Sequence, residues 1–187
     1  MLEIEIRSYI AEDCVFLTEL FYQTVHQINQ KDYSLRQLEV WAPKEVETQK
    51  WNKRFLSSYT VVALIKEKIV GFGNIDCDGY LDCLYVHANY QRQGVATLIY
   101  EALEQKVKRQ NHRIETHASI TAIPFFQAKG FNVLRPQVVI RQGIELENFI
   151  MEKVIKKSET YVSDFFIVYS FQEHPQCVQP LLLFDKS

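Results

Sequence analysis

The chain has 187 residues and a formal net charge of -2, and its composition is 47% hydrophobic and 24% charged. These values are typical of one soluble globular domain with a substantial core. Because the charge is near zero and the basic residues are scattered, nothing favours nucleic acid or an acidic membrane as a partner. No apolar run approaches the roughly 20 residues that cross a bilayer.

The cysteines and the N-terminal residues indicate the compartment. The four cysteines (Cys14, Cys77, Cys83, Cys177) form no CxxC pair. The first residues, MLEIEIR, alternate like a strand and have no signal-peptide pattern. We therefore expect a reduced, cytoplasmic protein without a metal site.

The N-terminal third is predicted to be a strand followed by helices. Residues 2–10 alternate like a strand, and residues 11–28 place their apolar side chains mainly on one helical stripe. Ser34 and Gln37 fit the S-x-x-Q capping box, which predicts a helix over SLRQLEVW (34–41) that Pro43 ends.

The middle of the chain is predicted to be an antiparallel meander. Its three β-rich pieces are 59–65, 69–76 and 80–86, and they are separated by turns at 66–68 and at Asp78-Gly79. A helix over 97–110 follows, with apolar residues recurring at i+4. The order of strands predicts a largely antiparallel sheet.

The remaining elements complete a mixed α/β fold. The expected order is a strand at 112–118, a short helix at 120–130, and closing strands at 131–137, 138–143 and 146–154. Because a helix lies between strands 80–86 and 112–118, these two can run parallel by a right-handed crossover. Residues 156–187 have apolar patches interrupted by prolines, and we assign them no role.

The polar turn NYQRQG (89–94) leads from strand 80–86 into the helix. A helix N-terminus presents unpaired N–H groups and the positive end of the helix dipole, so it suits an anion such as a phosphate. Gly94 would let the backbone approach the anion, although it could also serve only the turn. Arg92 could add a charged contact or simply be solvated. The candidate N–H groups belong to Gln93, Gly94, Val95, Ala96 and Thr97.

Two segments, LYVHANYQRQGVATLIYEAL and IPFFQAKGF, resemble the GNAT superfamily of acyl-CoA N-acyltransferases. The first is similar to the family's strand, Q/R-x-x-G-x-G/A loop and helix, and the second to its later helix and turn. The rival phosphate motifs, GK[ST] and G-x-G-x-x-G, are absent from the sequence. The resemblance implies a mostly antiparallel sheet with a splayed parallel strand pair, flanked by helices, over residues 1–155. Residues 156–187 would then be an extension.

The resemblance also implies acetyl-CoA as the co-substrate. In the family the thioester lies where the two central parallel strands splay apart, here strands 80–86 and 112–118. Main-chain groups of Leu84, Tyr85 and Val86 would then bind the pantetheine arm and polarise the thioester carbonyl.

Two residues beside that gap are candidates for the general base. Asp82 is the carboxylate closest to it by sequence and is the first candidate, although it could instead only orient the substrate. His117, on one strand face with Glu115, is the second, because histidine titrates near neutrality. A lone histidine in a strand is more often structural.

One position departs from the family pattern. Many members carry a tyrosine that protonates the leaving thiolate, as the second aromatic of an F-Y pair, whereas this chain has Phe125-Phe126. Phe126 can line the cofactor site but cannot donate a proton. Water or another hydroxyl must substitute, and the candidates are Ser119, Thr121, Tyr33 and Tyr85.

The acceptor is expected to lie against the less regular segments 22–42 and 135–143. The candidate pocket residues are His26, Asp32, Tyr33 and Trp41. One acidic residue among aromatics suits a small cationic amine, although Trp41 could instead cap the core. The expected function is direct acetyl transfer to a primary amine of a small molecule or peptide, by a monomer or homodimer. The alternative is a CoA-binding sensing module without turnover.

Overall fold

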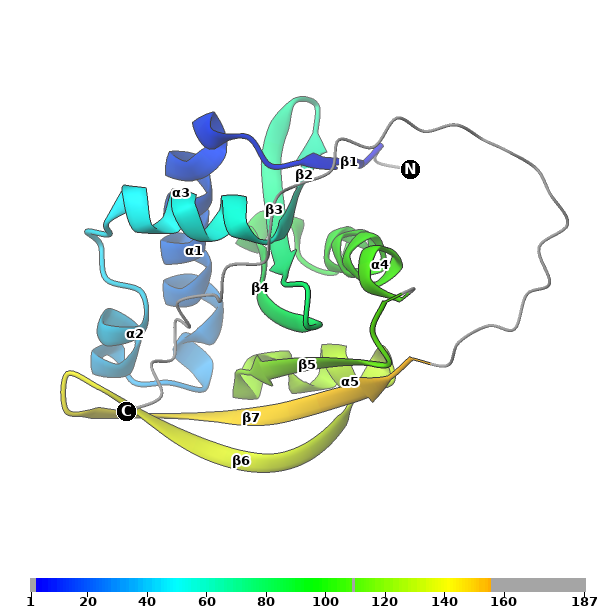
Figure 1. Cartoon of the computed structure of the whole chain (residues 1–187). Coiled ribbons are helices and arrows are strands. Elements are labelled where there is room, and N and C mark those ends of the chain that lie inside the picture. The colour runs from blue at the N-terminus through cyan, green and yellow to red at the C-terminus, as the bar shows by residue number, and fades with distance from the viewer. Residues whose placement is uncertain (1–2, 109, 156–187) are drawn as a thin grey trace, which may run out of the picture.

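The computed structural model describes residues 3–108 and 110–155, which form one mixed sheet with helices on both faces (Figure 1). The strand order is β1-β2-β3-β4-β5-β7-β6, and only the β4–β5 pair is parallel. The predicted fold class is therefore confirmed. The strands are β1 (Glu5–Ser8), β2 (Tyr59–Ile65), β3 (Lys68–Ile75), β4 (Tyr80–Val86), β5 (Arg113–Ala118), β6 (Asn132–Arg141) and β7 (Ile144–Val154).

The helices divide the core into two parts, one on each face of the sheet. Leu17, Phe21 and Phe55 pack with Phe72 beneath α1–α3, and Ile99 and the rest of α4 pack on the opposite face with α5. Alternating strand side chains enter one core or the other. The helices are α1 (Cys14–Ile28), α2 (Leu35–Trp41), α3 (Thr48–Ser57), α4 (Val95–Val107) and α5 (Ile123–Ala128).

The predicted capping box is present at the start of α2. The Gln37 N–H donates to Ser34 Oγ at 3.4 Å, and the Ser34 N–H donates to Gln37 Oε1 at 2.8 Å. These two bonds satisfy backbone donors that the helix itself cannot pair, so they fix where the helix begins.

The structure differs from the predicted elements in two places. No helix was predicted between Pro43 and residue 59, yet α3 forms there because Trp51 and Phe55, one helical turn apart, are both buried. The predicted strands 131–137 and 138–143 are one continuous strand, β6. Pro136 is tolerated within it because β6 is at the edge of the sheet, where a missing N–H need not break a ladder.

The parallel strands β4 and β5 part soon after they meet. Their register comprises only Tyr80↔Glu115 and Leu81↔Thr116. At the point of separation the Thr116 hydroxyl donates to the Leu81 carbonyl at 2.8 Å. The rest of each strand diverges, so the sheet has an interruption at its centre that side chains must line.

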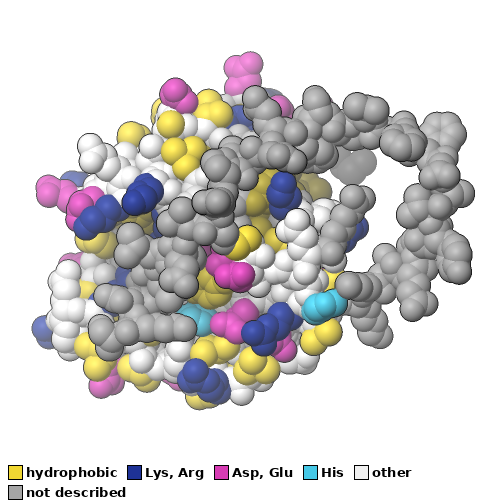
Figure 2. Space-filling model, viewed as in Figure 1, with side chains coloured by type: hydrophobic (Ala, Val, Ile, Leu, Met, Phe, Trp, Pro, Cys, Tyr) yellow, Lys and Arg dark blue, Asp and Glu magenta, His cyan; other side chains and the backbone are white. Residues whose placement is uncertain are grey.

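The described surface is mixed in charge. Basic and acidic side chains are interspersed over the described part of the face in Figure 2. Within residues 3–108 and 110–155, no helix is both long enough and apolar enough to span a membrane.

Candidate functional site

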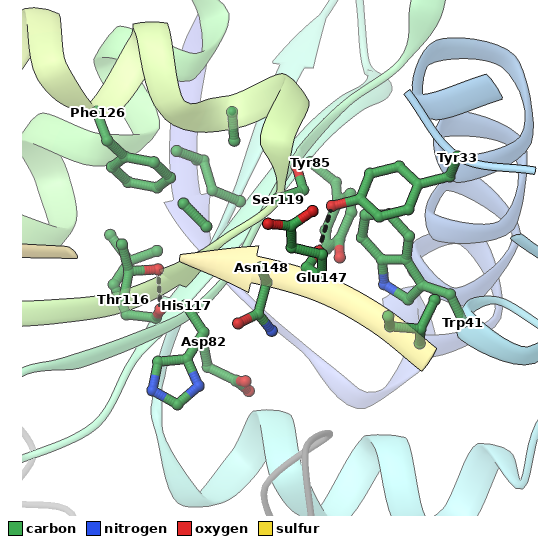
Figure 3. Close-up of a pocket in the computed structure, with 15 residues that line it drawn as sticks. Tyr33, Trp41, Asp82, Tyr85, Thr116, His117, Ser119, Phe126, Glu147 and Asn148 are labelled. Carbon is green, nitrogen blue, oxygen red and sulfur yellow. Dashed lines mark hydrogen bonds between the residues drawn. The ribbon is translucent and has the colours of Figure 1, made fainter. Parts of the chain in front are cut away.

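A cavity occupies the place where β4 and β5 separate (Figure 3). Leu84, Ala118 and Phe126 in its wall belong to the core beneath α4 and α5, whereas Trp41 and Leu146 belong to the core beneath α1–α3. The cavity therefore reaches both faces of the sheet. Its lining residues are Tyr33, Trp41, Leu81, Asp82, Leu84, Tyr85, Thr116, His117, Ala118, Ser119, Ala122, Phe126, Leu146, Glu147 and Asn148.

Asp82 forms a buried ion pair with Arg54 of α3. The side chains are 5% and 8% exposed respectively, and Asn74 Nδ2 of β3 donates to Asp82 Oδ2 at 3.3 Å. Burial alone would lower the pKa of Arg54, but the neighbouring Cys83 and Asp82 outweigh it and raise that pKa. The guanidinium thus stays charged and balances the carboxylate that faces the cavity.

His117 of β5 is held on several sides. Its Nδ1 lies 3.1 Å from Nε2 of Gln137 on β6, and its Nε2 lies 3.5 Å from Oε1 of Glu115. The Tyr80 ring meets the imidazole edge to face, with centroids 5.2 Å apart. These contacts fix the ring in the wall of the cavity that Asp82 also lines.

Ser119 and Tyr33 form another part of the wall. The Tyr33 hydroxyl donates to the Glu147 carbonyl at 2.7 Å and accepts from the Ile120 N–H at 3.0 Å. Burial raises the pKa of Tyr33 to about 12, so its proton is committed to that carbonyl. Ser119 Oγ lies 3.5 Å from Nδ2 of Asn29 and faces the cavity.

Only two of the four residues expected to bind the acceptor line the cavity. Tyr33 and Trp41 line the cavity, and Trp41 is also buried in the core with 9% exposure. His26 places Nε2 2.9 Å from the Ala42 carbonyl, and Asp32 accepts from Thr121 Oγ1 at 2.5 Å. Neither His26 nor Asp32 lines the cavity.

The junction before α4 has the expected open geometry. Gly94 is the N-cap with φ 88, and a Cβ built on it would meet no atom within 4 Å. The Leu98 N–H donates to the Gly94 carbonyl at 3.1 Å, so the N–H groups just before it lack intrahelical acceptors. These exposed N–H groups suit an anion such as a pyrophosphate.

The residues around this junction differ in backbone conformation and in their hydrogen bonds. Arg92 has a left-handed φ of 58, and Gln93 Nε2 donates to the Asn89 carbonyl at 3.0 Å. The Val86 carbonyl accepts from Gln91 Nε2 at 2.7 Å, so it is tied into the protein. Leu84 and Tyr85, by contrast, lie in the cavity wall.

The sequence did not predict the polar site residues Arg54, Thr116, Glu147 and Asn148. The Trp51 and Phe55 spacing would have revealed the helix that carries Arg54, although not its partner. For Asn148 the signal is its inward position in the alternating strand, between Leu146 and Ile150. No group of three or more His, Cys, Asp or Glu residues that could hold a metal occurs within the described part of the chain.

Comparison with known proteins gives consistent results. The sequence profile of the acetyltransferase (GNAT) domain matches residues 29–155. The chain is 32% identical over 151 residues to the uncharacterized N-acetyltransferase YafP of Escherichia coli strain K12, which covers 81% of this chain and 96% of that protein.

Solved structures with the same fold include two N-acetyltransferases. A GCN5-related N-acetyltransferase from Rhodopseudomonas palustris superposes with a TM-score of 0.79 at 28% identity, covering 82% of this chain and 98% of that one. PaiA N-acetyltransferase from Thermoplasma acidophilum, in complex with coenzyme A, gives a TM-score of 0.66 at 20% identity, covering 82% and 99%.

Proposed function

The chain belongs to the GNAT acetyltransferase family, and on that basis we propose that it transfers an acetyl group from acetyl-CoA directly to a primary amine of a small molecule or peptide. The family predicted from the sequence is thereby confirmed, and the chain is an acyl-CoA-dependent acetyltransferase. The observation that carries the proposal is the cavity that reaches both faces of the sheet. Two substrates can enter it from opposite faces and meet in the gap.

On the α4 face, the open backbone around Gly94 fits the pyrophosphate of acetyl-CoA. Arg92 is proposed to add a charge-assisted contact. Main-chain groups of Leu84 and Tyr85 would hold the pantetheine arm, with Val86 completing that strand and Phe126 packing against the arm. The backbone donors proposed for the pyrophosphate are those of Gln93, Gly94, Val95, Ala96 and Thr97.

Bound acetyl-CoA supplies a thioester carbonyl for attack by a neutral amine. On the α1–α3 face, Asp82 is balanced by Arg54, so its carboxylate suits accepting a hydrogen bond that orients the amine. We assign proton removal to His117, directly or through water, because its ring is fixed in the same cavity wall. Tyr33 and Trp41 would bound the acceptor.

Departure of the CoA thiolate needs a proton donor in place of the family tyrosine. Ser119 is the proposed donor, because its hydroxyl faces the cavity whereas the Tyr33 proton is committed to a carbonyl. The proton that His117 takes from the amine would then return to the Ser119 oxygen. The presence of Phe126 is the feature that would favour a CoA-binding module without turnover.

One experiment separates these two functions. Acetyl-CoA is titrated into the protein in a calorimeter, and thiol release is then followed with a panel of amines and peptides. We expect binding, and thiol release that depends on the amine. Binding without release across the panel would favour the sensing module, and absence of binding would contradict the assignment of the α4 junction.

A further inference from the structure

Asn148 of β7 is a buried polar side chain without a hydrogen-bond partner in the part of the chain that the structure describes. It is 3% exposed, and both Oδ1 and Nδ2 are buried without a hydrogen-bond partner among the described residues. Its carboxamide lies in the middle of the cavity, between Ser119 and Glu147 on one side and Asp82 and His117 on the other (Figure 3). As an unpaired polar residue of the cavity wall, Asn148 is placed to pair with a ligand there.

The neighbouring groups show how unusual this is. Leu146 and Ile150, two residues away on the same strand face, are apolar and 3% and 8% exposed. Two other polar groups of the wall have partners: the Thr116 hydroxyl donates to Leu81, and the Tyr33 hydroxyl to Glu147. Burying an unpaired carboxamide destabilises a fold, so this side chain suits a ligand better than it suits the core.

The face of the sheet tells which substrate Asn148 would meet. Phe149 and Met151 pack into the core beneath α4 and α5, whereas Leu146 packs into the core beneath α1–α3. Side chains alternate along a strand, so Asn148 shares the α1–α3 face with Leu146. The Gly94 junction proposed for the cofactor belongs to α4 on the opposite face.

We propose that Asn148 is a specificity-determining residue that recognises an amide group of the acceptor, an inference that rests on the proposed function. A carboxamide presents an acceptor oxygen beside a donor N–H, and a second primary amide, whose C=O and N–H lie on the same side, complements both in one plane. The acceptor class is thus an amine that carries a primary amide near the reacting nitrogen, such as an amino acid amide. The pantetheine arm also contains amides, so the test must distinguish the two sources.

The test compares wild type with Asn148→Leu, using amino acid amides and the matching methyl esters as acceptors. An ester keeps the carbonyl but lacks the N–H donor. We expect wild type to prefer the amide by about 10–100-fold in kcat/KM and Asn148→Leu to abolish that preference. Acetyl-CoA affinity should stay within about twofold, and Tm should rise by about 2–4 °C because an unpaired carboxamide is removed.

Matched controls make the result specific. Ile150→Leu alters the same strand face outside the cavity lining and should preserve the amide preference. Thr116→Val removes a paired hydroxyl and should lower Tm, opposite to Asn148→Leu. An unchanged preference in Asn148→Leu overturns the inference, and so does weakened acetyl-CoA binding, which would assign Asn148 to pantetheine. Thiol release by wild type without amide preference overturns the inference alone, whereas no release with any amine overturns the proposed function as well.

Discussion

The two faces of the sheet build their halves of the site from different material. On the α4 face the groups proposed for acetyl-CoA are backbone groups of one continuous segment, opened by Gly94. On the α1–α3 face the groups are side chains from distant elements, with Arg54 on α3, Asp82 on β4, His117 on β5 and Asn148 on β7. A backbone site needs only one turn, whereas a side-chain site needs the whole fold.

Because of this difference, substitutions on the two faces should have different measurable effects. Substitutions on the α4 face should change acetyl-CoA affinity, whereas substitutions on the α1–α3 face should change acceptor kinetics and spare that affinity. A substitution on one face that changed both acetyl-CoA affinity and acceptor kinetics would show that the two halves of the site are coupled through the cavity.

The largest expected effect comes from Arg54→Met. It leaves the buried carboxylate of Asp82 without its counter-charge, which we expect to lower the free energy of unfolding by about 3–5 kcal/mol. Urea unfolding measures this change. The double variant Arg54→Met with Asp82→Leu should recover most of the stability but not the acetyl transfer. A single variant as stable as wild type would contradict the buried pair.

Next comes Gly94→Trp, which places a large side chain in the open space over the α4 junction. We expect the Kd for acetyl-CoA to rise at least about 100-fold, equivalent to about 2.7 kcal/mol, as measured by calorimetry. Gly143→Trp is the matched control, because Gly143 also has a positive φ, 74, and open space around its Cβ position. Both should incur a similar backbone strain of about 1–2 kcal/mol. Equal affinity in the two variants would remove the junction from the cofactor site.

His117→Gln is expected to act on the other face. As general base, His117 removes the proton of the attacking amine, so its replacement should slow turnover without weakening acetyl-CoA binding. We expect kcat to fall about 100-fold and acetyl-CoA affinity to stay within about twofold. His112→Gln, at an exposed position just before β5, is the control. An unchanged kcat would return the base role to Asp82.

The features that the sequence could predict also differ between the two faces of the sheet. The order of strands, the parallel β4–β5 pair and the α4 junction were predicted because local patterns encode them: alternation, a crossover helix and Gly94 in a turn. The Arg54–Asp82 pair could not be predicted, because no local pattern relates residues of α3 and β4. The unpaired state of Asn148 could not be predicted either, because it depends on which groups surround the side chain in the folded protein.

The smallest expected effect comes from Phe126→Tyr, in the wall of the cavity between the two faces. Phe126 is 4% exposed, lines the cavity and packs against Phe131 with ring centroids 5.1 Å apart. Phe126→Tyr adds a hydroxyl that can protonate the leaving thiolate, so we expect kcat to rise a few-fold with unchanged acetyl-CoA affinity. Phe125→Tyr, which adds the same hydroxyl outside the cavity lining, should leave kcat unchanged. An unchanged kcat in Phe126→Tyr would mean that Ser119 or water already supplies the proton. Adding Ser119→Ala to that variant would distinguish the two. The second substitution should lower kcat only if Ser119 is the donor.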